Sequence, residues 1–140
     1  MHTKARPAIL EFGKSQYTIQ EMTDTQQLLD SIRNGIQEKK GEKITIADLT
    51  GIEDTACSYF VICQGGSPSQ LLAIADSIRE TVRIEAGVKP SYTEGTRYAH
   101  WVAMDYGEVM VHIFVPELRQ FYDMEHLWAD AVLTEIPDLD

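Results

Sequence analysis

The sequence predicts a single α/β domain in which a mixed β-sheet of about five strands is flanked by helices. Three observations support this fold class. The chain has 140 residues, the size of one ordinary domain. Two long segments repeat apolar residues at helical spacing, and shorter apolar or alternating runs typical of strands lie between and after them. No internal repeat or low-complexity linker divides the chain.

The first predicted helix begins at a capping box over residues 23–26 (TDTQ). In that motif Thr23 would satisfy a free backbone amide of the first turn, and Gln26 would bond back to the cap. The helix is supported by an apolar stripe and by the stop signal KKG at residues 39–41. The stripe consists of Leu28, Leu29, Ile32 and Ile36.

Two strands are predicted next, at residues 43–49 (KITIADL) and 59–64 (YFVICQ), with a connecting loop at 51–58. The second run is apolar on both faces, which is typical of a central strand covered on two sides. The segment 63–70 (CQGGSPSQ) joins it to a second helix. Ser67 and Gln70 form another capping box, and Pro68 suits the first helical position. The apolar stripe of this helix is Leu71, Ile74, Ala75, Ile78 and Val82, and Gly87 ends it.

A glycine turn between a strand and a helix is also where phosphate-binding loops occur. However, residues 63–70 contain neither the GxxxxGK[ST] pattern of a P-loop nor the GxGxxG pattern of a dinucleotide site. Nucleotidyltransferases combine a Gly-Ser turn with a DxD or DxE carboxylate pair on the next strand, and no such pair follows on a predicted strand. We interpret the segment as a structural turn, which leaves weak anion binding by helix amides open.

The second half of the chain predicts an antiparallel hairpin of residues 100–105 (HWVAMD) and 108–115 (EVMVHIFV). Gly107 in the tight joint is expected at a positive φ. Two short helices should follow, PELRQFYD at 116–123 and MEHLWADA at 124–131, the latter with Leu127 and Trp128 facing inward. The end of the chain, TEIPDLD at 134–140, is expected to be frayed. The predicted organisation is a leader at 1–20, a domain at 21–132 and an acidic tail at 133–140.

The net charge of −10 is unevenly distributed. Residues 91–140 contain ten acidic side chains against Arg97 and Arg119, so they carry −8 of that charge. Such a surface repels phosphate backbones and attracts cationic partners. We therefore expect a basic protein partner and no direct specific nucleic-acid binding, the alternative being a charge excess that serves solubility.

The residues that usually carry catalysis or metal binding lack the required spacing. The four histidines show neither HxxxH nor HExxH, and Cys57 and Cys63 form no CxxC pair. No apolar run approaches the length of a membrane span. We expect a cytoplasmic protein that is not an enzyme and needs no metal or cofactor.

Aromatic and acidic residues converge on the predicted hairpin and the helix after it. Alternation places Trp101, Ala103 and Asp105 on one face of their strand and Val102 and Met104 on the other. A Trp and a Tyr beside acidic residues are typical of a protein-binding hot spot. The alternative is that Trp101 and Tyr122 close the edge of the core.

Several ordered motifs resemble one known family. The pieces E-G-x(5)-W (94–101), D-Y-G-E-V-x-V-H-I-F (105–114) and R-x-F-Y-x-x-E-x-L-W (119–128) are similar to those of the Iojap-type ribosomal silencing factors (RsfS) of bacteria. The resemblance extends over roughly residues 25–130. It implies a fold related to nucleotidyltransferases without their catalytic carboxylates. It also implies a factor that binds the large ribosomal subunit through its fourteenth ribosomal protein, blocks subunit joining and lowers translation when nutrients are short.

The resemblance also implies which residues contact the partner. Trp101 and Tyr122 match family positions that contact the ribosomal protein. The resemblance also suggests Glu94, Gly95, Asp105 and Arg119 as further contact residues around them. One departure is Ser69, where the family often has a basic residue. Two other hypotheses remain from the sequence: a degenerate nucleotidyltransferase-like enzyme or nucleotide-binding protein, and a homodimer that uses the same face.

Overall fold

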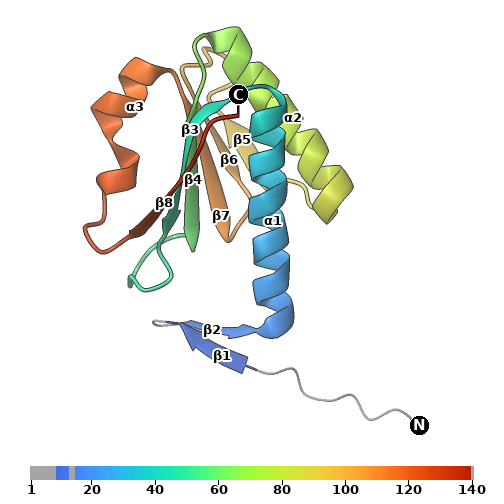
Figure 1. Ribbon diagram of the computed structural model, residues 1–140, viewed down its shortest axis with the longest axis vertical. Coiled ribbons are helices and arrows are strands. Elements are labelled where there is room, and N and C mark those ends of the chain that lie inside the picture. The colour runs from blue at the N-terminus through green and yellow to red at the C-terminus, as the bar shows by residue number, and fades with distance from the viewer. Residues whose placement is uncertain (1–8, 13–14, 140) are drawn as a thin grey trace.

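The computed structural model describes residues 9–12 and 15–139, so half of the predicted leader lies outside the described residues. Groups of two or three strands are separated by helices along most of the described chain (Figure 1). In order, the elements are β1 (Ile9–Phe12), β2 (Ser15–Thr18), α1 (Ile19–Glu38), β3 (Glu42–Asp48), β4 (Tyr59–Gln64), α2 (Pro68–Ala86), β5 (Tyr92–Glu94), β6 (Trp101–Asp105), β7 (Val109–Phe114), α3 (Pro116–Tyr122), the 3-10 helix η1 (Met124–His126) and β8 (Val132–Ile136).

The main sheet is mixed, as the sequence predicts, with six strands in the order β5-β6-β7-β4-β3-β8. Among the described strands of this sheet, β4 and β7 are parallel neighbours, while the other four pairs are antiparallel. The apolar strand β4 lies inside the sheet between β7 and β3, which confirms its prediction as a central strand. Strands β1 and β2 form a separate hairpin ahead of α1.

The two faces of the main sheet carry different cores. Helices α1 and α2 lie on one face, and α3 with the turns after it lies on the other (Figure 1). The core under α1 and α2 is mostly aliphatic and includes Ile32, Ile36, Ile74, Ile78 and Val111. Helices α1 and α2 approach so closely that a Cβ at Gly35 would lie 2.7 Å from the Ile78 Cα. The opposite face has a smaller core built around Phe60 and Phe114.

Local cues at α2 and at the hairpin are confirmed. The Ser67 Oγ caps α2 by accepting a bond from the Gln70 amide at 3.2 Å, and Pro68 is the first helical residue. Gly87 ends the helix in the left-handed region with φ 67°. Strands β6 and β7 pair antiparallel, and Gly107 between them has φ 84°.

The predicted start of α1 is wrong. The helix begins at Ile19, and Thr23 lies inside it with its hydroxyl donating to the Ile19 carbonyl at 2.9 Å. Gln26 is also inside the helix, where its side-chain Nε2 donates to the Asp30 carboxylate at 3.0 Å. A threonine hydroxyl can bond a carbonyl one turn earlier as readily as it caps a helix, so the motif alone does not fix the start.

The predictions for the carboxyl end also need correction. The expected helix at 124–131 is only the single turn η1, and Leu127 is 57% exposed rather than inward. Trp128 does face inward, with its ring centroid 5.3 Å from that of Phe60. The expected frayed end instead contains β8, which pairs with β3 over five residues. Backbone pairing with an open sheet edge holds β8, although most of its side chains are exposed.

None of the helices in the described part of the chain has the length and apolar character needed to cross a lipid bilayer.

Candidate partner-binding face

Trp101 lies at the first position of β6, in register with Phe114 of β7. Its half-buried indole stacks on the Phe114 ring with centroids 5.0 Å apart, and the Tyr122 ring of α3 lies 4.8 Å from it. Phe121 adds an edge contact to Tyr122 at 5.1 Å. These four rings form what we call the aromatic cluster. Phe121 is 77% exposed and Tyr122 45% exposed, so the cluster reaches from the core to the surface.

His112 of β7 forms a hydrogen bond with the aromatic cluster. The Trp101 Nε1–H donates to the His112 Nδ1 at 3.0 Å. Because Nδ1 accepts, the ring proton of neutral His112 is on Nε2, which meets no hydrogen-bonding group among the described residues. Phe60 packs edge-on against this ring with centroids 4.9 Å apart. Burial lowers the pKa of His112 to about 4, so the ring is neutral near pH 7.

Gly95 brings the loop after β5 against the start of β6. A Cβ at this position would lie 2.0 Å from the Trp101 carbonyl oxygen, and the backbone has φ 86°. Both facts require glycine here. Glu94 is exposed and opposes Ala103 on β6. The structure therefore keeps Glu94 and Gly95 on the strand pair that carries Trp101, with Gly95 shaping the backbone.

Asp105 does not join the aromatic cluster. It ends β6, four residues after Trp101, which places it about 13 Å along the strand. Its carboxylate accepts a bond from the Gly107 amide at 2.7 Å. Asp105 thus has a clear role in the hairpin turn.

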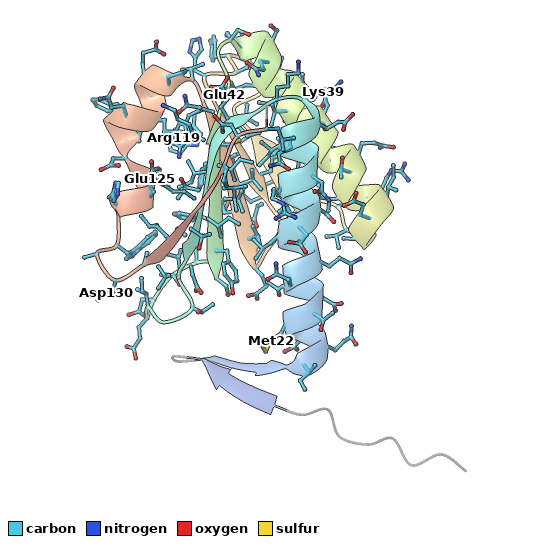
Figure 2. All side chains as sticks on the ribbon, in the orientation of Figure 1. Met22, Lys39, Glu42, Arg119, Glu125 and Asp130 are labelled. Carbon is cyan, nitrogen blue, oxygen red and sulfur yellow. The ribbon has the colours of Figure 1, made fainter. Side chains whose placement is uncertain are left out.

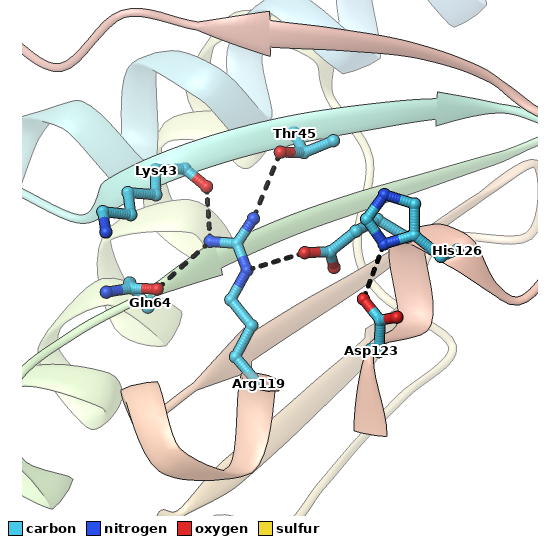
Figure 3. A network of polar contacts seen from close by, with 7 residues as sticks. Lys43, Thr45, Gln64, Arg119, Asp123 and His126 are labelled. Carbon is cyan, nitrogen blue, oxygen red and sulfur yellow. Dashed lines mark hydrogen bonds and ion pairs between the residues drawn. The ribbon is translucent and has the colours of Figure 1, made fainter. Parts of the chain in front are cut away.

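Arg119 points from α3 onto the sheet, where it is 8% exposed (Figure 2). Figure 3 shows its guanidinium donating to the Lys43 carbonyl, to the Thr45 hydroxyl at 3.1 Å and to Gln64 at 3.4 Å. The Nε pairs with Glu125 at 3.3 Å. Arg119 therefore joins α3, the segment after it, β3 and β4, and leaves little guanidinium surface for a partner.

A groove lies beside this network, between α3 with η1 and the strands β3 and β8. Its lining mixes both signs of charge, from Lys43, Arg119, Glu125, Glu135 and Asp138. Two of the carboxylates are already bonded within the protein, because Glu125 pairs with Arg119 at 3.3 Å and Asp138 accepts from the Lys43 backbone amide at 2.7 Å. The groove thus has no single charge that would select a ligand.

The glycine turn before α2 satisfies much of its own backbone. The Gly65 amide donates to the Phe114 carbonyl at 3.0 Å, and the Gly66 amide donates to the Gln70 Oε1 at 2.7 Å. The Gln70 amide is taken by Ser67. These three amides are unavailable to a phosphate, which supports the interpretation of a structural turn.

The thiols are poorly suited to nucleophilic chemistry. Burial raises the pKa of Cys63 to about 12 and that of Cys57 to about 11, so both remain protonated near neutral pH. Within the described ranges, no three His, Cys, Asp or Glu side chains come together as a metal site would require.

Sequence reasoning did not assign His112 and Phe114 to the aromatic cluster. One signal could have found them. Trp101 is on the face of its strand opposite Val102 and Met104, and the residues at alternate positions of the paired strand share that face. His112 and Phe114 occupy two such positions.

The chain is similar in sequence to proteins of one known family. A family model described as "Ribosomal silencing factor during starvation" (RsfS) matches residues 22–140. The chain belongs to the RsfS family. A ribosomal silencing factor RsfS of Halalkalibacterium halodurans is 36% identical over 79% of this chain and 93% of its own length. RsfS of Bacillus subtilis is 39% identical over 71% of this chain and 82% of its own.

Solved structures give the same result for the RsfS fold. A crystal structure of a Bacillus halodurans protein has a TM-score of 0.65 and 34% identity to this chain. It covers 76% of this chain and 97% of its own. The resemblance expected from the sequence motifs and the single-domain α/β fold are therefore confirmed.

Proposed function

We propose that this protein represses translation under nutrient limitation by binding the large ribosomal subunit and blocking the small subunit from joining. The observation that carries the proposal is the aromatic cluster, which presents Tyr122 and Phe121 to solvent beside Trp101 in a chain of the silencing-factor family. Large aromatic side chains supply contact area at low entropy cost and are enriched at binding hot spots.

The charge around the aromatic cluster favours a basic partner. Three acidic side chains are exposed near the rings: Glu117 on α3, Asp123 directly after that helix, and Glu94 on β5, the strand that pairs with β6. The partner we propose is a basic ribosomal protein, the fourteenth of the large subunit. Complementary charge would raise the association rate and discriminate against wrong partners, while the rings supply most of the affinity.

The proposed mechanism is steric and needs no turnover. A factor seated on the joining face of the large subunit excludes the small subunit for as long as it stays bound. Repression then depends on occupancy, and each loss of about 1.4 kcal/mol in binding weakens the affinity tenfold. We propose that this occurs in the cytoplasm.

Co-sedimentation with purified ribosomal subunits tests the proposal. We expect the protein to pellet with large subunits and not with small ones. Trp101→Ala should weaken that binding by ~2–4 kcal/mol while circular dichroism shows a folded protein. Ile84→Ala is the matched control, because Ile84 is 66% exposed on α2, which covers the other sheet face. It should bind like the wild type.

Two results would contradict the proposal. Absence of binding to large subunits at micromolar concentration would remove the function, and a metal-dependent nucleotide titration would then test the nucleotidyltransferase-like alternative. Unfolding of Trp101→Ala would instead support a role in closing the core edge. In that case Tyr122→Ala, which removes a ring that is 45% exposed, separates binding from folding.

A further inference from the structure

The bond between Trp101 and His112 links the surface of the aromatic cluster to the sheet. His112 comes from β7, next to the strand that carries Trp101, and is 6% exposed. The Nδ1 that accepts the indole N–H belongs to a ring held on several sides. Phe60 packs at 4.9 Å, Phe114 at 6.1 Å and Trp101 at 5.7 Å between ring centroids. The acceptor therefore has little freedom to move.

The choice of histidine at position 112 needs a reason. A buried polar ring is less favourable than a hydrocarbon ring of similar size unless its polar atoms are paired. Only Nδ1 is paired among the described residues, and its partner is the indole of Trp101. The bond to Trp101 is thus the interaction in the structure that a phenylalanine at this position would lose.

We infer that His112 is a positioning residue that fixes the orientation of the Trp101 indole for partner binding. The inference rests on the proposed function, because it assigns His112 a role through Trp101. With its N–H held, the indole keeps its stacking on Phe114 and Tyr122 before any partner arrives. Binding then costs less side-chain entropy, since the contact is already ordered in the free protein.

Loss of the acceptor should disturb the indole rather than the fold. In His112→Phe an aromatic ring is kept at this position, but the Trp101 N–H becomes an unpaired donor at a half-buried site. The indole must then leave the donor unsatisfied or turn it toward water. Either outcome changes the surface that the partner meets.

The test combines large-subunit binding with nuclear magnetic resonance of the indole N–H in the full chain. We expect His112→Phe to bind large subunits about tenfold more weakly, as the loss of one hydrogen bond allows. The Trp101 indole resonance should shift and exchange faster with solvent. His112→Asn, whose side-chain oxygen can occupy the place of Nδ1, should recover part of the affinity.

Two comparisons separate positioning from a packing effect. Phe60→Leu removes a ring that packs on His112 without touching the indole bond, so it should lower stability but preserve binding. In a Trp101→Phe background, which lacks the donor, His112→Phe should weaken binding no further.

The outcomes distinguish this inference from the proposed function. The inference is overturned if Trp101→Ala weakens binding while His112→Phe binds like Phe60→Leu, or if the two effects add in the double variant. If Trp101→Ala itself binds like the wild type, the proposed contact fails, and the role of His112 in partner binding fails with it.

Discussion

The two faces of the main sheet are built from different kinds of interaction. On the face covered by α1 and α2, aliphatic side chains such as Ile32, Ile74 and Ile78 are fully buried and make no directional bonds. On the face covered by α3, stacked rings and hydrogen-bonded groups predominate, and the surface stays partly open. One face is a closed core, while the other holds a short helix by specific bonds and leaves aromatic rings exposed.

This difference indicates a division of roles. Aliphatic packing tolerates replacement by side chains of similar volume, because its free energy depends mainly on buried area and shape. Hydrogen bonds to a buried guanidinium or imidazole tolerate no such replacement, since the abandoned partner is left unpaired. Substitutions on the two faces should therefore differ in kind. Three predictions test that contrast from the largest effect to the smallest, and a fourth, with the smallest effect of all, concerns the glycine turn outside both faces.

The largest effect is expected for Arg119→Met. Removing the guanidinium leaves the Glu125 carboxylate and the Lys43 carbonyl without their partner in a mostly buried site. Breaking a buried pair on one side costs about 3–5 kcal/mol. We expect the free energy of unfolding, measured with urea, to fall by about that amount.

The matched control for Arg119 is Arg79→Met. Arg79 also pairs with a carboxylate, that of Asp76 at 3.1 Å, but both side chains are largely exposed. Its loss should leave the urea midpoint nearly unchanged, because exposed ion pairs contribute little. Similar losses in the two variants would contradict a special role for the buried network.

On the face covered by α1 and α2, Ile78→Ala should cost about 3 kcal/mol of unfolding free energy. Ile78 is fully buried where α1 and α2 meet, so its truncation removes buried area and leaves a cavity. Ile78→Leu keeps the volume and should cost less than about 1.5 kcal/mol. Thermal unfolding of both variants provides the measurement, and equal losses would show that shape matters here as strictly as on the α3 face.

The third prediction concerns pH. His112 has a folded pKa of about 4 against an ordinary value of 6.5, so below pH 6.5 the unfolded chain binds a proton that the native chain does not. The stability that depends on neutral His112 is fully present above pH 6.5 and is lost as the pH drops toward 4. The lost stability should reach about 2 kcal/mol by pH 5. The unfolding free energy of the wild type minus that of His112→Phe should fall by that amount between pH 7.5 and pH 5, and a value that does not change with pH would contradict the prediction.

The elements that the sequence predicts correctly depend on neighbouring residues. The start of α2 follows from Ser67, Pro68 and Gln70 within four positions, and its stripe continues without interruption. The start of α1 is missed because the hydroxyl of Thr23 can serve a cap or a helix interior equally well. Strand β8 is missed because its side chains are mostly exposed and its partner β3 is distant in sequence.

The same distinction applies to the candidate face. Alternation along β6 places Trp101 on the opposite face from Val102 and Met104, and the helix after the hairpin brings Tyr122 to it. The burial of Arg119 could not be predicted, because charged side chains are usually exposed. Its partners Lys43, Thr45 and Gln64 lie 76, 74 and 55 residues away in sequence. Only the fold brings those groups together.

The smallest effect should come from the glycine turn, which belongs to neither face. Ser67→Ala removes the acceptor for the Gln70 amide and should cost about 1 kcal/mol of unfolding free energy, the usual loss for a helix cap. Because Gly65 and Gly66 already bond within the protein, the variant should bind large subunits normally. A loss of ribosome binding in folded Ser67→Ala would mean that the turn contacts the partner, and the interface would then extend beyond the aromatic cluster to the start of α2.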